Sequence, residues 1–564
     1  MNDFFPLFSK RDTTVLDGLW DFCWLGEVQD RAVKPSKLVY NELSPVPGTF
    51  DSSVKRYNAR GVAVYKRTVR CSAGLKRLEI GGLGLYGKVF WDGIALGECT
   101  GPYTSYAFDF ETQAGEHALQ ILVDNRFSKD HPTLFHNYAD FYAFGGIYRS
   151  VLLRSLPKKR MERDAVKTLD RGLGKVQLAI STAGFPNGKP ILDIAFDNRV
   201  AVSRTVNIQD NQAVIQLRVP KFKIWTPETP NLHTVTVSSA DDAVTERFGI
   251  RTVCTRGQKV LLNGKPIRFC GVNRHESHPE LGPLAQTQLM FDDLMHVKNL
   301  GANFIRCVHY TQDPIFLDMC DQVGILIWEE SLGWNNPDDD ANIPALRNAG
   351  IQDTAAMVRR DLNHPSIIFW GFLNESCSNT ETGRLWYQDI TNAIRAEDST
   401  RLVTFASNKS TSELCFDFAD VMCTNLYPGW IDCRWDEECN SRVKPCLDDF
   451  AKWASTGGRE KKPLIVSEIG ACGIYGTHDY GQAQWTEEFQ AEFFKVACEA
   501  ILNNPRYAGI ALWQMFDTRS YVGSGSVRTK PFGLNLAGLL DPYRRPKLAY
   551  ETVRKIFRRH LGLA

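Results

Sequence analysis

From residue 256 onward, the chain alternates short apolar runs with stretches of helical periodicity. Eight of these runs are predicted as strands, at residues 269–273, 303–310, 325–331, 367–375, 403–408, 421–427, 464–468 and 509–517. Helical spacing of apolar residues fills most of the intervals, most clearly at 286–300, 485–502 and 546–557. Runs that are apolar throughout are typical of strands buried on both faces. Eight βα units over about 300 residues predict a TIM barrel.

Two β-rich regions precede this segment. Up to about residue 156, short alternating strands are separated by Gly and Asp-Gly turns, which predicts a jelly-roll sandwich over residues 1–156. Residues 157–252 are also strand-rich, and their length suits an immunoglobulin-like sandwich. The predicted fold class is therefore multidomain, β plus α/β: a jelly-roll β-sandwich, an immunoglobulin-like β-sandwich and a C-terminal (β/α)8 TIM barrel at 253–564.

The composition argues against several classes of partner. The 564 residues carry 66 Lys and Arg against 65 Asp and Glu, so neither a nucleic-acid nor an anionic-membrane partner is expected. No window approaches the roughly 20 apolar residues of a membrane span, and residues 1–6 lack a signal-peptide pattern. The 15 cysteines include no Cys-x-x-Cys pair and are expected to be reduced thiols. A cytoplasmic location is therefore expected.

Two of the apolar runs end in a glutamate: Glu375 closes the fourth predicted strand and Glu468 closes the seventh. In a TIM barrel, catalytic groups lie at the C-terminal ends of the strands. Strands four and seven lie on opposite sides of the barrel mouth, so the two carboxylates are expected to face each other. Such a pair is what cleavage of a glycosidic bond requires. The alternative, an ordinary exposed residue at the start of a loop, weakens because both glutamates end strongly apolar strands.

The neighbours of these glutamates fit the two chemical roles. The Asn374 amide can hydrogen-bond a sugar hydroxyl. Trp370 and Phe372 are expected to supply the apolar surroundings that keep a carboxylic acid protonated near neutral pH. Tyr427, at the end of the sixth predicted strand, can donate a hydrogen bond to an ionised nucleophile.

Several motifs resemble those of glycoside hydrolase family two. In the predicted barrel they are NRHE at 273–276, RCVHY at 306–310, NHPSI at 363–367 and SEIG at 467–470. In the two sandwiches they are LDGLWDF at 16–22, VPG at 46–48, WTPETPNL at 225–232 and RFGIR at 247–251. The resemblance covers essentially the whole chain, and the three-domain layout is most similar to the β-glucuronidase branch.

This resemblance implies an exo-acting, retaining glycosidase that hydrolyses a small-molecule or oligosaccharide glycoside. Glu375 would be the acid/base and Glu468 the nucleophile that forms a glycosyl-enzyme. No cofactor or metal is required by this mechanism, and a homo-oligomer is possible because family members are often dimers or tetramers. The residues implied to contact the sugar are Asp140, His275, His309, Asn374, Tyr427, Trp513 and Asn535.

Two positions depart from the β-glucuronidase pattern. Those enzymes carry an Asn-x-Lys motif whose lysine pairs with the uronic-acid carboxylate, whereas here Asn535 is followed by Ala537 at the lysine position. A tyrosine that follows a Gly-Trp pair in those enzymes is Ile431 here. Since a buried carboxylate without a partner is strongly unfavourable, a uronide substrate requires another cation.

The loop 517–538 offers such cations in Arg519, Arg528 and Lys530, and Arg347 is a further candidate after the third predicted strand. A clamp made by Arg528 and Lys530 would suit a β-hexuronide, either a β-galacturonide or a β-glucuronide, which is the favoured substrate class. If these cations are solvated surface residues, the sugar is neutral. A β-galactoside, a β-galactofuranoside or an α-L-arabinopyranoside would then be the substrate.

Two other interpretations are weaker. His275, Glu276, His278 and His309 imitate a zinc cluster, but their spacing matches no strong zinc motif. A non-catalytic sugar-binding protein on the same scaffold is the alternative from another class. The two retained carboxylates argue against it.

Overall fold

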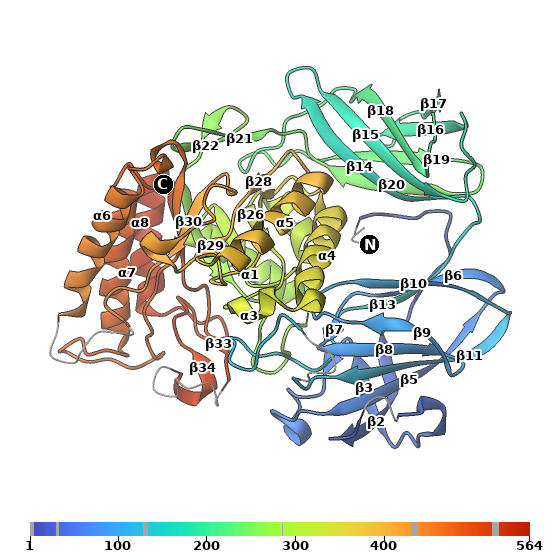
Figure 1. Ribbon diagram of the computed structural model, residues 1–564, viewed down its shortest axis with the longest axis horizontal. Coiled ribbons are helices and arrows are strands. Elements are labelled where there is room, and N and C mark those ends of the chain that lie inside the picture. The colour runs from blue at the N-terminus through green and yellow to red at the C-terminus, as the bar shows by residue number, and fades with distance from the viewer. Residues whose placement is uncertain are drawn as a thin grey trace.

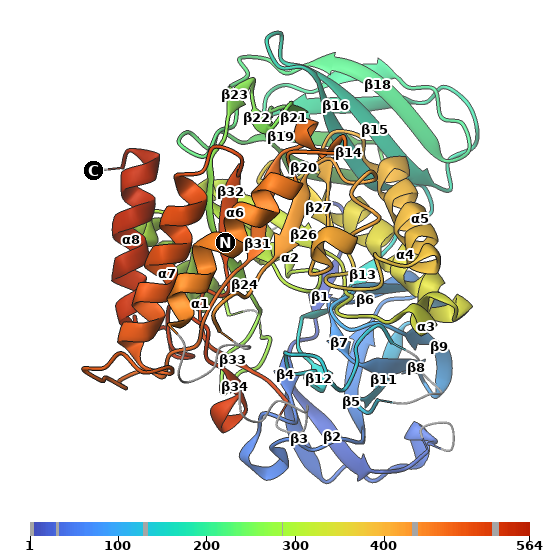
Figure 2. The ribbon, with the colours of Figure 1, turned by 60° about the vertical axis from the view of Figure 1, so that its left-hand side comes forward.

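The computed structural model describes residues 5–29, 33–127, 133–284, 286–430, 438–521 and 530–563. Two β-rich bodies, coloured blue to cyan and teal to green, lie beside a larger body in which helices surround a central sheet (Figures 1 and 2). The predicted fold class, two sandwiches followed by a TIM barrel, is confirmed.

The first body is an antiparallel sandwich. One sheet contains, in spatial order, β1 (Thr13–Val15), β13 (Val151–Ser155), β6 (Gly74–Ile80) and β10 (Tyr106–Thr112). The second contains β3 (Glu42–Val46), β2 (Gly18–Gly26), β5 (Val62–Cys71), β11 (Gly115–Asp124), β8 (Tyr86–Trp91) and β9 (Ile94–Cys99). A third, small sheet contains β4 (Gly48–Thr49), β12 (Gly146–Ile147) and β7 (Leu83–Gly84). Large apolar side chains such as Trp20, Tyr65 and Ile121 fill the space between the sheets. Their burial holds this body together.

The second body is a smaller antiparallel sandwich. One sheet contains β14 (Arg160–Asp170), β15 (Lys175–Ala183) and β18 (Gln212–Arg218), and the other contains β17 (Val202–Thr205), β16 (Ile191–Phe196), β19 (His233–Ser238) and β20 (Ala243–Phe248). Side chains along β15 alternate between buried and half-buried, so Val176, Leu178 and Ile180 face the core. This period of two is the local reason for a strand with one buried face.

The third body is a closed parallel barrel. Its strands follow the order β28 (Leu402–Val403), β27 (Ile367–Gly371), β26 (Leu326–Glu330), β25 (Phe304–Cys307), β24 (Phe269–Arg274), β32 (Gly509–Leu512), β31 (Leu464–Glu468), β30 (Met422–Asn425) and β29 (Ala406–Ser407). The two outermost strands, β28 and β29, follow each other directly in the chain. They are therefore two halves of the fifth barrel strand, and the sheet closes on itself.

Helices surround the barrel: α1 (Thr287–Leu300), α2 (Pro314–Val323), α3 (Asp338–Ala341), α4 (Pro344–Asp361), α5 (Glu381–Glu397), α6 (Val443–Trp453), α7 (Glu487–Leu502) and α8 (Leu548–Leu561). Residues 408–421, all of them described, form only a 3-10 turn at Ser410–Ser412 where the fifth barrel helix would lie. A short sheet, β21 (Val253–Arg256), β22 (Lys259–Leu262) and β23 (Lys265–Pro266), precedes the barrel. After β32 in the chain, β33 (Thr518–Arg519) and β34 (Leu534–Asn535) pair to form a two-stranded sheet.

Of the two strands predicted to end in a glutamate, only one does so. β31 ends on Glu468 as predicted, but β27 ends at Gly371, so the prediction that Glu375 closes its strand is wrong. Leu373 and Glu375 adopt positive φ angles of 45° and 52°, which are incompatible with a continuing strand. The backbone N–H of Glu375 donates instead to the Ala406 carbonyl oxygen at 2.9 Å. The acid is therefore carried by a constrained loop anchored to the neighbouring strand.

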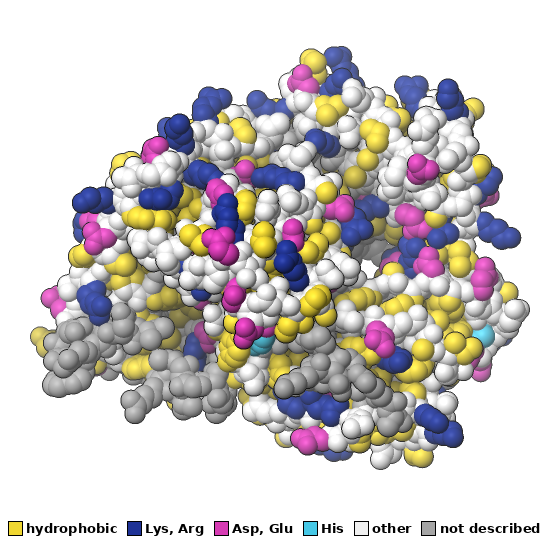
Figure 3. Space-filling model, in the orientation of Figure 1, with side chains coloured by type: hydrophobic (Ala, Val, Ile, Leu, Met, Phe, Trp, Pro, Cys, Tyr) yellow, Lys and Arg dark blue, Asp and Glu magenta, His cyan; other side chains and the backbone are white. Residues whose placement is uncertain are grey.

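The surface and the thiols agree with the composition. Figure 3 shows acidic and basic side chains interspersed over the visible face of the described residues. None of the helices in the described ranges has the length and apolarity needed to cross a membrane. The cysteines whose side chains are described are free thiols, and most of them are buried.

Candidate active site

Glu468, the last residue of β31, is buried and held by two strong donors. Nη1 of Arg306 donates to Oε1 at 2.6 Å, and the Tyr427 hydroxyl donates to Oε2 at 2.6 Å. Burial raises the pKa of this carboxyl, while Arg306 and the Tyr427 hydrogen bond oppose that rise. Both donors favour the ionised form, so this carboxylate is kept charged and oriented.

Glu375 has different surroundings. Its Oε1 accepts one hydrogen bond, from Nδ2 of Asn425 at 2.8 Å, and no cation pairs with its carboxylate among the described residues. Burial first, and the nearby charge of Glu468 second, raise the pKa of Glu375 to about 8. At neutral pH the Glu375 carboxyl is therefore largely protonated, whereas Arg306 and Tyr427 favour the ionised form of Glu468. Two neighbouring carboxyls with separated pKa values are the arrangement that general acid catalysis needs.

Arg306, on β25, connects the components of the site. Besides Glu468, its guanidinium pairs with Glu330 at 2.9 Å and donates to Oδ1 of Asn374 at 2.8 Å. It also lies over the Trp328 ring, 4.6 Å from the centroid. Five donors in a rigid fork allow one arginine to orient several acceptors at once.

Asn374 is oriented by two donors on the same oxygen. Its Oδ1 accepts from Arg306 and, at 3.1 Å, from Nδ2 of Asn425. Its buried Nδ2 has no hydrogen-bond partner within the described ranges. Since buried donors in proteins are almost always paired, this nitrogen is poised to donate to a ligand.

Two histidines present the same kind of unpaired atom. Nδ1 of His309 lies 3.0 Å from the Glu330 carboxylate, and Nδ1 of His275 lies 3.3 Å from the Tyr310 hydroxyl. The Nε2 atoms of both rings are buried and have no partner in the described part of the chain. Burial lowers the pKa of both imidazoles, so they are neutral and can exchange hydrogen bonds with sugar hydroxyls.

Aromatic rings form the wall behind these histidines. Trp513 stacks on His309 with 5.4 Å between ring centroids, and Phe141 from the first sandwich packs against both His275 and His309. Trp513 directly follows β32, so the predicted strand at 509–517 ends earlier, at Leu512. The first sandwich therefore contributes directly to the wall of this site.

The predicted apolar surroundings of Glu375 are not supplied by Trp370 and Phe372. Nε1 of Trp370 donates to Asp398 at 2.9 Å, and Phe372 packs against Tyr387 of α5. Both rings belong to the layer between the sheet and the outer helices. Alternation along β27 turns Trp370 away from the interior, because successive side chains of a strand point to opposite faces, and Phe372, just beyond the strand, packs on the same side.

Asp140, Lys530 and Asn535 meet beside the mouth. The Asp140 carboxylate, from the first sandwich, forms an ion pair with Lys530 and accepts from Nδ2 of Asn535 at 2.8 Å and from Oγ of Ser520 at 3.1 Å. Ala537, at the position of the expected lysine, is buried behind Asn535. A cation therefore lies beside Asn535, but it comes from another position of the loop.

The other candidate cations do not join this cluster. Arg519 donates to Asn58 and covers the Tyr142 ring at 3.7 Å, so it connects the barrel to the first sandwich. Arg347 pairs with Asp389 on the outer helix layer. Neither side chain supplies the predicted alternative clamp. Arg528 and Ile431 lie outside the described residues.

Two histidine–carboxylate groups raise the question of a metal. In the first, the group around His275 and Glu276 that the sequence analysis set aside, both oxygens of Glu276 are taken, by Arg149 at 2.8 Å and by the Asp313 backbone N–H at 2.7 Å. The second group consists of Asp318, Asp321 and His364. Its carboxylate oxygens accept from Arg247, from the backbone N–H groups of Phe5 and Ser366, and from His364. Both groups therefore fit ion pairs better than a cation site.

Sequence reasoning missed four residues of the site: Arg306, Glu330, Asn425 and Lys409. Arg306 and Glu330 are charged residues within fully buried strands, and such residues usually have a function. They were overlooked because the apolar residues around them dominate the sequence pattern. Asn425 ends β30, as a functional residue of a barrel does. Lys409 donates to the Glu375 carbonyl oxygen at 3.0 Å, and nothing in its local sequence distinguishes it.

Comparison with known proteins agrees with this geometry. The family model described as glycosyl hydrolases family 2, TIM barrel domain, matches residues 253–560, and the one described as glycosyl hydrolases family 2 matches residues 176–251. The crystal structure of a GH2 β-galacturonidase from Eisenbergiella tayi bound to galacturonate is 30% identical, with a TM-score of 0.90 over 99% of each chain.

Curated relatives carry related names. The β-glucuronidase of Rattus norvegicus is 26% identical over 97% of this chain and 92% of its own. The β-galactosidase of Thermoanaerobacter pseudethanolicus is 31% identical over 56% of this chain and 44% of its own. With the family model covering more than half of its length, the chain belongs to glycoside hydrolase family 2 and hydrolyses O-glycosyl bonds.

Proposed function

We propose that the protein is a retaining exo-β-glycosidase whose terminal sugar is a β-hexuronide, a β-galacturonide or a β-glucuronide. The observation that carries the mechanism is the unlike environment of the two carboxyls, Glu468 charged between Arg306 and Tyr427, and Glu375 kept protonated. The likeness to a β-galacturonidase over the full chain supports the substrate class.

In the first step, an oxygen of Glu468 attacks the anomeric carbon while Glu375 gives its proton to the departing glycosidic oxygen. The product is a covalent glycosyl-enzyme and a free aglycone alcohol. Ester formation removes the negative charge of Glu468, which is one of the causes of the raised Glu375 pKa. The pKa of Glu375 therefore falls, and this carboxylate takes a proton from the water that hydrolyses the ester.

The unpaired atoms of the site account for sugar binding. Nε2 of His275, Nε2 of His309 and Nδ2 of Asn374 are offered to hydroxyls of the bound ring. Lys530, held beside Asn535 by Asp140, is the cation proposed to meet the hexuronate carboxylate. A lysine ammonium carries three donors, so it can pair with the substrate without releasing Asp140.

One observation favours a neutral sugar instead. The charge of Lys530 is already neutralised by Asp140, and Ala537 replaces the lysine of the β-glucuronidase pattern. If Lys530 only positions Asp140, the sugar is a β-galactoside, a β-galactofuranoside or an α-L-arabinopyranoside.

Lys530→Ala separates these two substrate classes. Loss of one charge-assisted hydrogen bond is worth about 1.5–3 kcal/mol, which lowers kcat/KM on an aryl β-hexuronide by about 10- to 100-fold. The same variant is expected to change hydrolysis of an aryl β-galactoside much less. Steady-state kinetics on both substrates provide the measurement, with the outer-layer variant Arg347→Ala as the matched control. Equal losses on both sugars would assign Lys530 to a positioning role and support a neutral substrate.

The pH dependence tests the assignment of Glu375. The acid must carry a proton, so kcat/KM is expected to fall as the pH rises through about 8, the pKa of Glu375 in the free enzyme. The charge of Lys409 lowers this pKa. In Lys409→Met the alkaline limb is therefore expected to move to higher pH. A pH profile of kcat/KM for both proteins checks this, and a shift to lower pH would contradict it.

A further inference from the structure

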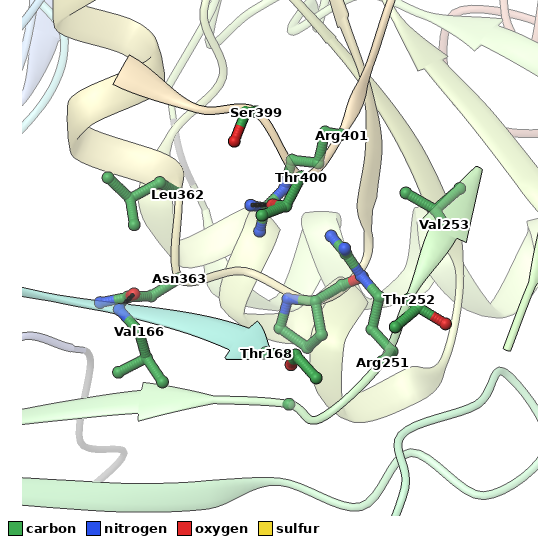
Figure 4. A pocket seen from close by; sticks show the side chains of 12 residues that line it. Val166, Thr168, Arg251, Thr252, Val253, Leu362, Asn363, Ser399, Thr400 and Arg401 are labelled. Atoms are coloured by element: carbon green, nitrogen blue, oxygen red, sulfur yellow. Dashed lines mark hydrogen bonds between the residues drawn. The ribbon is translucent and has the colours of Figure 1, made fainter. Parts of the chain in front are cut away.

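A second cavity lies at the junction between the second sandwich and the barrel. Its volume is about 190 Å³, and it is bounded by β14, the segment after β20, and the segments that lead into β27 and β28. The last two segments are at the N-terminal ends of their strands, the opposite end of the barrel from Glu375 and Glu468. This cavity, whose lining side chains are drawn in Figure 4, is therefore separate from the catalytic site.

Arg251 places a buried positive charge in this cavity without a counter-ion. Arg251 is only 5% exposed. Its guanidinium donates to the carbonyl oxygen of Pro365 at 3.0 Å and to that of Ile367 at 2.6 Å. No carboxylate of the described residues lies within ion-pair distance of its guanidinium, and Nη1 has no acceptor among them. Burial and the charge of Arg401 lower the pKa of Arg251 to about 9, so the group stays protonated at neutral pH.

Two more cations lie at or next to this cavity: Arg401 lines it, and Lys167 lies between two of its lining residues. Arg401 is 6% exposed, and Figure 4 shows its guanidinium and that of Arg251 turned toward the middle of the cavity. Lys167, next to the lining residues of β14, donates to Oγ of Ser399 at 2.7 Å on the rim.

The nearby acids are already in use. Asp398 pairs with Arg401 at 2.9 Å and also accepts from the Trp370 indole and from Thr400. Asp321 pairs with His364 at 2.7 Å. The cavity therefore has an excess of positive charge, and an isolated buried charge is costly unless something pairs with it.

We propose that this cavity binds a small oxyanion, such as phosphate, sulfate or a carboxylate, between Arg251 and Lys167. Nη1 of Arg251, which has no acceptor among the described residues, carries two N–H groups, and guanidinium N–H groups are strong donors to this ligand class. The hydroxyls of Thr168, Thr252 and Ser399 line the same space and can complete its hydrogen bonds. At about 30 Å³ per water molecule, the volume admits such an anion together with ordered water.

The bound anion would connect two bodies of the molecule. Arg251 and Lys167 belong to the second sandwich, whereas Ser399, which accepts from Lys167, precedes β28 of the barrel. An anion shared between them stabilises the junction, since any ligand that binds only the folded state shifts unfolding by mass action.

Calorimetric titration of sodium sulfate into the full-length protein tests this inference. One equivalent is expected to bind with a Kd of about 1 mM or tighter, and sodium chloride at equal ionic strength is expected to give no such heat. Parallel titrations with phosphate and acetate distinguish a tetrahedral oxyanion from a carboxylate ligand. Repeating the titration with Lys530→Ala removes the active-site cation, so the heat that remains reports sulfate bound elsewhere in the protein.

Two variants locate the site, and one serves as their control. Thr168→Asp puts a carboxylate into the cavity and is expected to abolish sulfate binding. Lys167→Met leaves the cavity shape unchanged and is expected to raise the Kd at least fivefold. Lys189→Met, an exposed lysine of the same sandwich, is expected to bind like the parent. Absence of binding by the parent protein, or equal affinity in Lys167→Met, would overturn the proposal whether or not Thr168→Asp folds.

Discussion

Glu468→Gln is expected to lower kcat on aryl glycosides by at least about 10⁴-fold, the loss typical of removing a catalytic nucleophile. The amide retains the shape of the side chain but cannot form the glycosyl ester. Arg306 and Tyr427 donate to the two oxygens of Glu468, so the substitution also replaces one acceptor by a donor. Initial rates measured with a good leaving group such as 4-nitrophenol quantify the loss.

The smaller alanine variants tell the two roles apart when azide is added. In Glu468→Ala, azide occupies the space of the missing carboxylate and attacks the anomeric carbon directly, which yields the α-glycosyl azide. In Glu375→Ala the glycosyl-enzyme still forms with an activated aglycone, and azide attacks it to yield the β-glycosyl azide.

NMR of the products reads these configurations, and Glu280→Gln on the surface serves as a control with parent-like activity. The α-product from Glu375→Ala, or a parent enzyme that first releases the α-sugar, would contradict a retaining mechanism with these assignments.

Arg306→Met is expected to cost about 3–5 kcal/mol of the free energy of unfolding of the barrel, because it leaves buried carboxylates without their partner. Both Glu330 and Glu468 pair with this guanidinium, and Arg306 and Glu330 are inaccessible to solvent. Denaturant unfolding followed by tryptophan fluorescence measures the change. The barrel transition is compared rather than a single global midpoint, since multidomain chains depart from two-state behaviour.

The matched comparison is Arg347→Ala, which breaks a partly exposed pair with Asp389 and is expected to cost at most about 1 kcal/mol. Adding Glu330→Gln to Arg306→Met removes one of the two unpaired charges and is expected to restore part of the lost stability. A loss for Arg306→Met as small as that for Arg347→Ala would show that the buried network contributes little to the stability of the barrel.

The barrel and the strand that ends at Glu468 could be predicted from local sequence. A strand buried on both faces needs apolar residues at every position, and 464–468 satisfies this so fully that its predicted and observed bounds agree. The same pattern misled at 367–375, where the apolar run continues past the end of the strand at Gly371. Hydrophobicity records burial, and a buried loop satisfies it as well as a strand does.

The residues around the two acids could not be read in this way. Arg306 and Glu330 lie on neighbouring strands, and their pairing depends on the register between β25 and β26. Lys530 reaches Asp140 across 390 positions of the chain. Several cations of this loop could have faced the barrel mouth. Packing of the first sandwich against the barrel selects among them, because Arg519 contacts Asn58 and Tyr142 of that sandwich while Lys530 lies beside Asn535.

By itself, the sequence determined the three-part architecture, the near-neutral surface, the family and the residue types at the reaction centre, because each depends on local pattern or on recognisable motifs. Only the tertiary structure decided which carboxyl is protonated, which cation lies beside Asn535, and that Arg251 is buried without a counter-ion. These properties arise from distances between residues far apart in the chain, and electrostatic energies depend on such distances and on burial rather than on residue order.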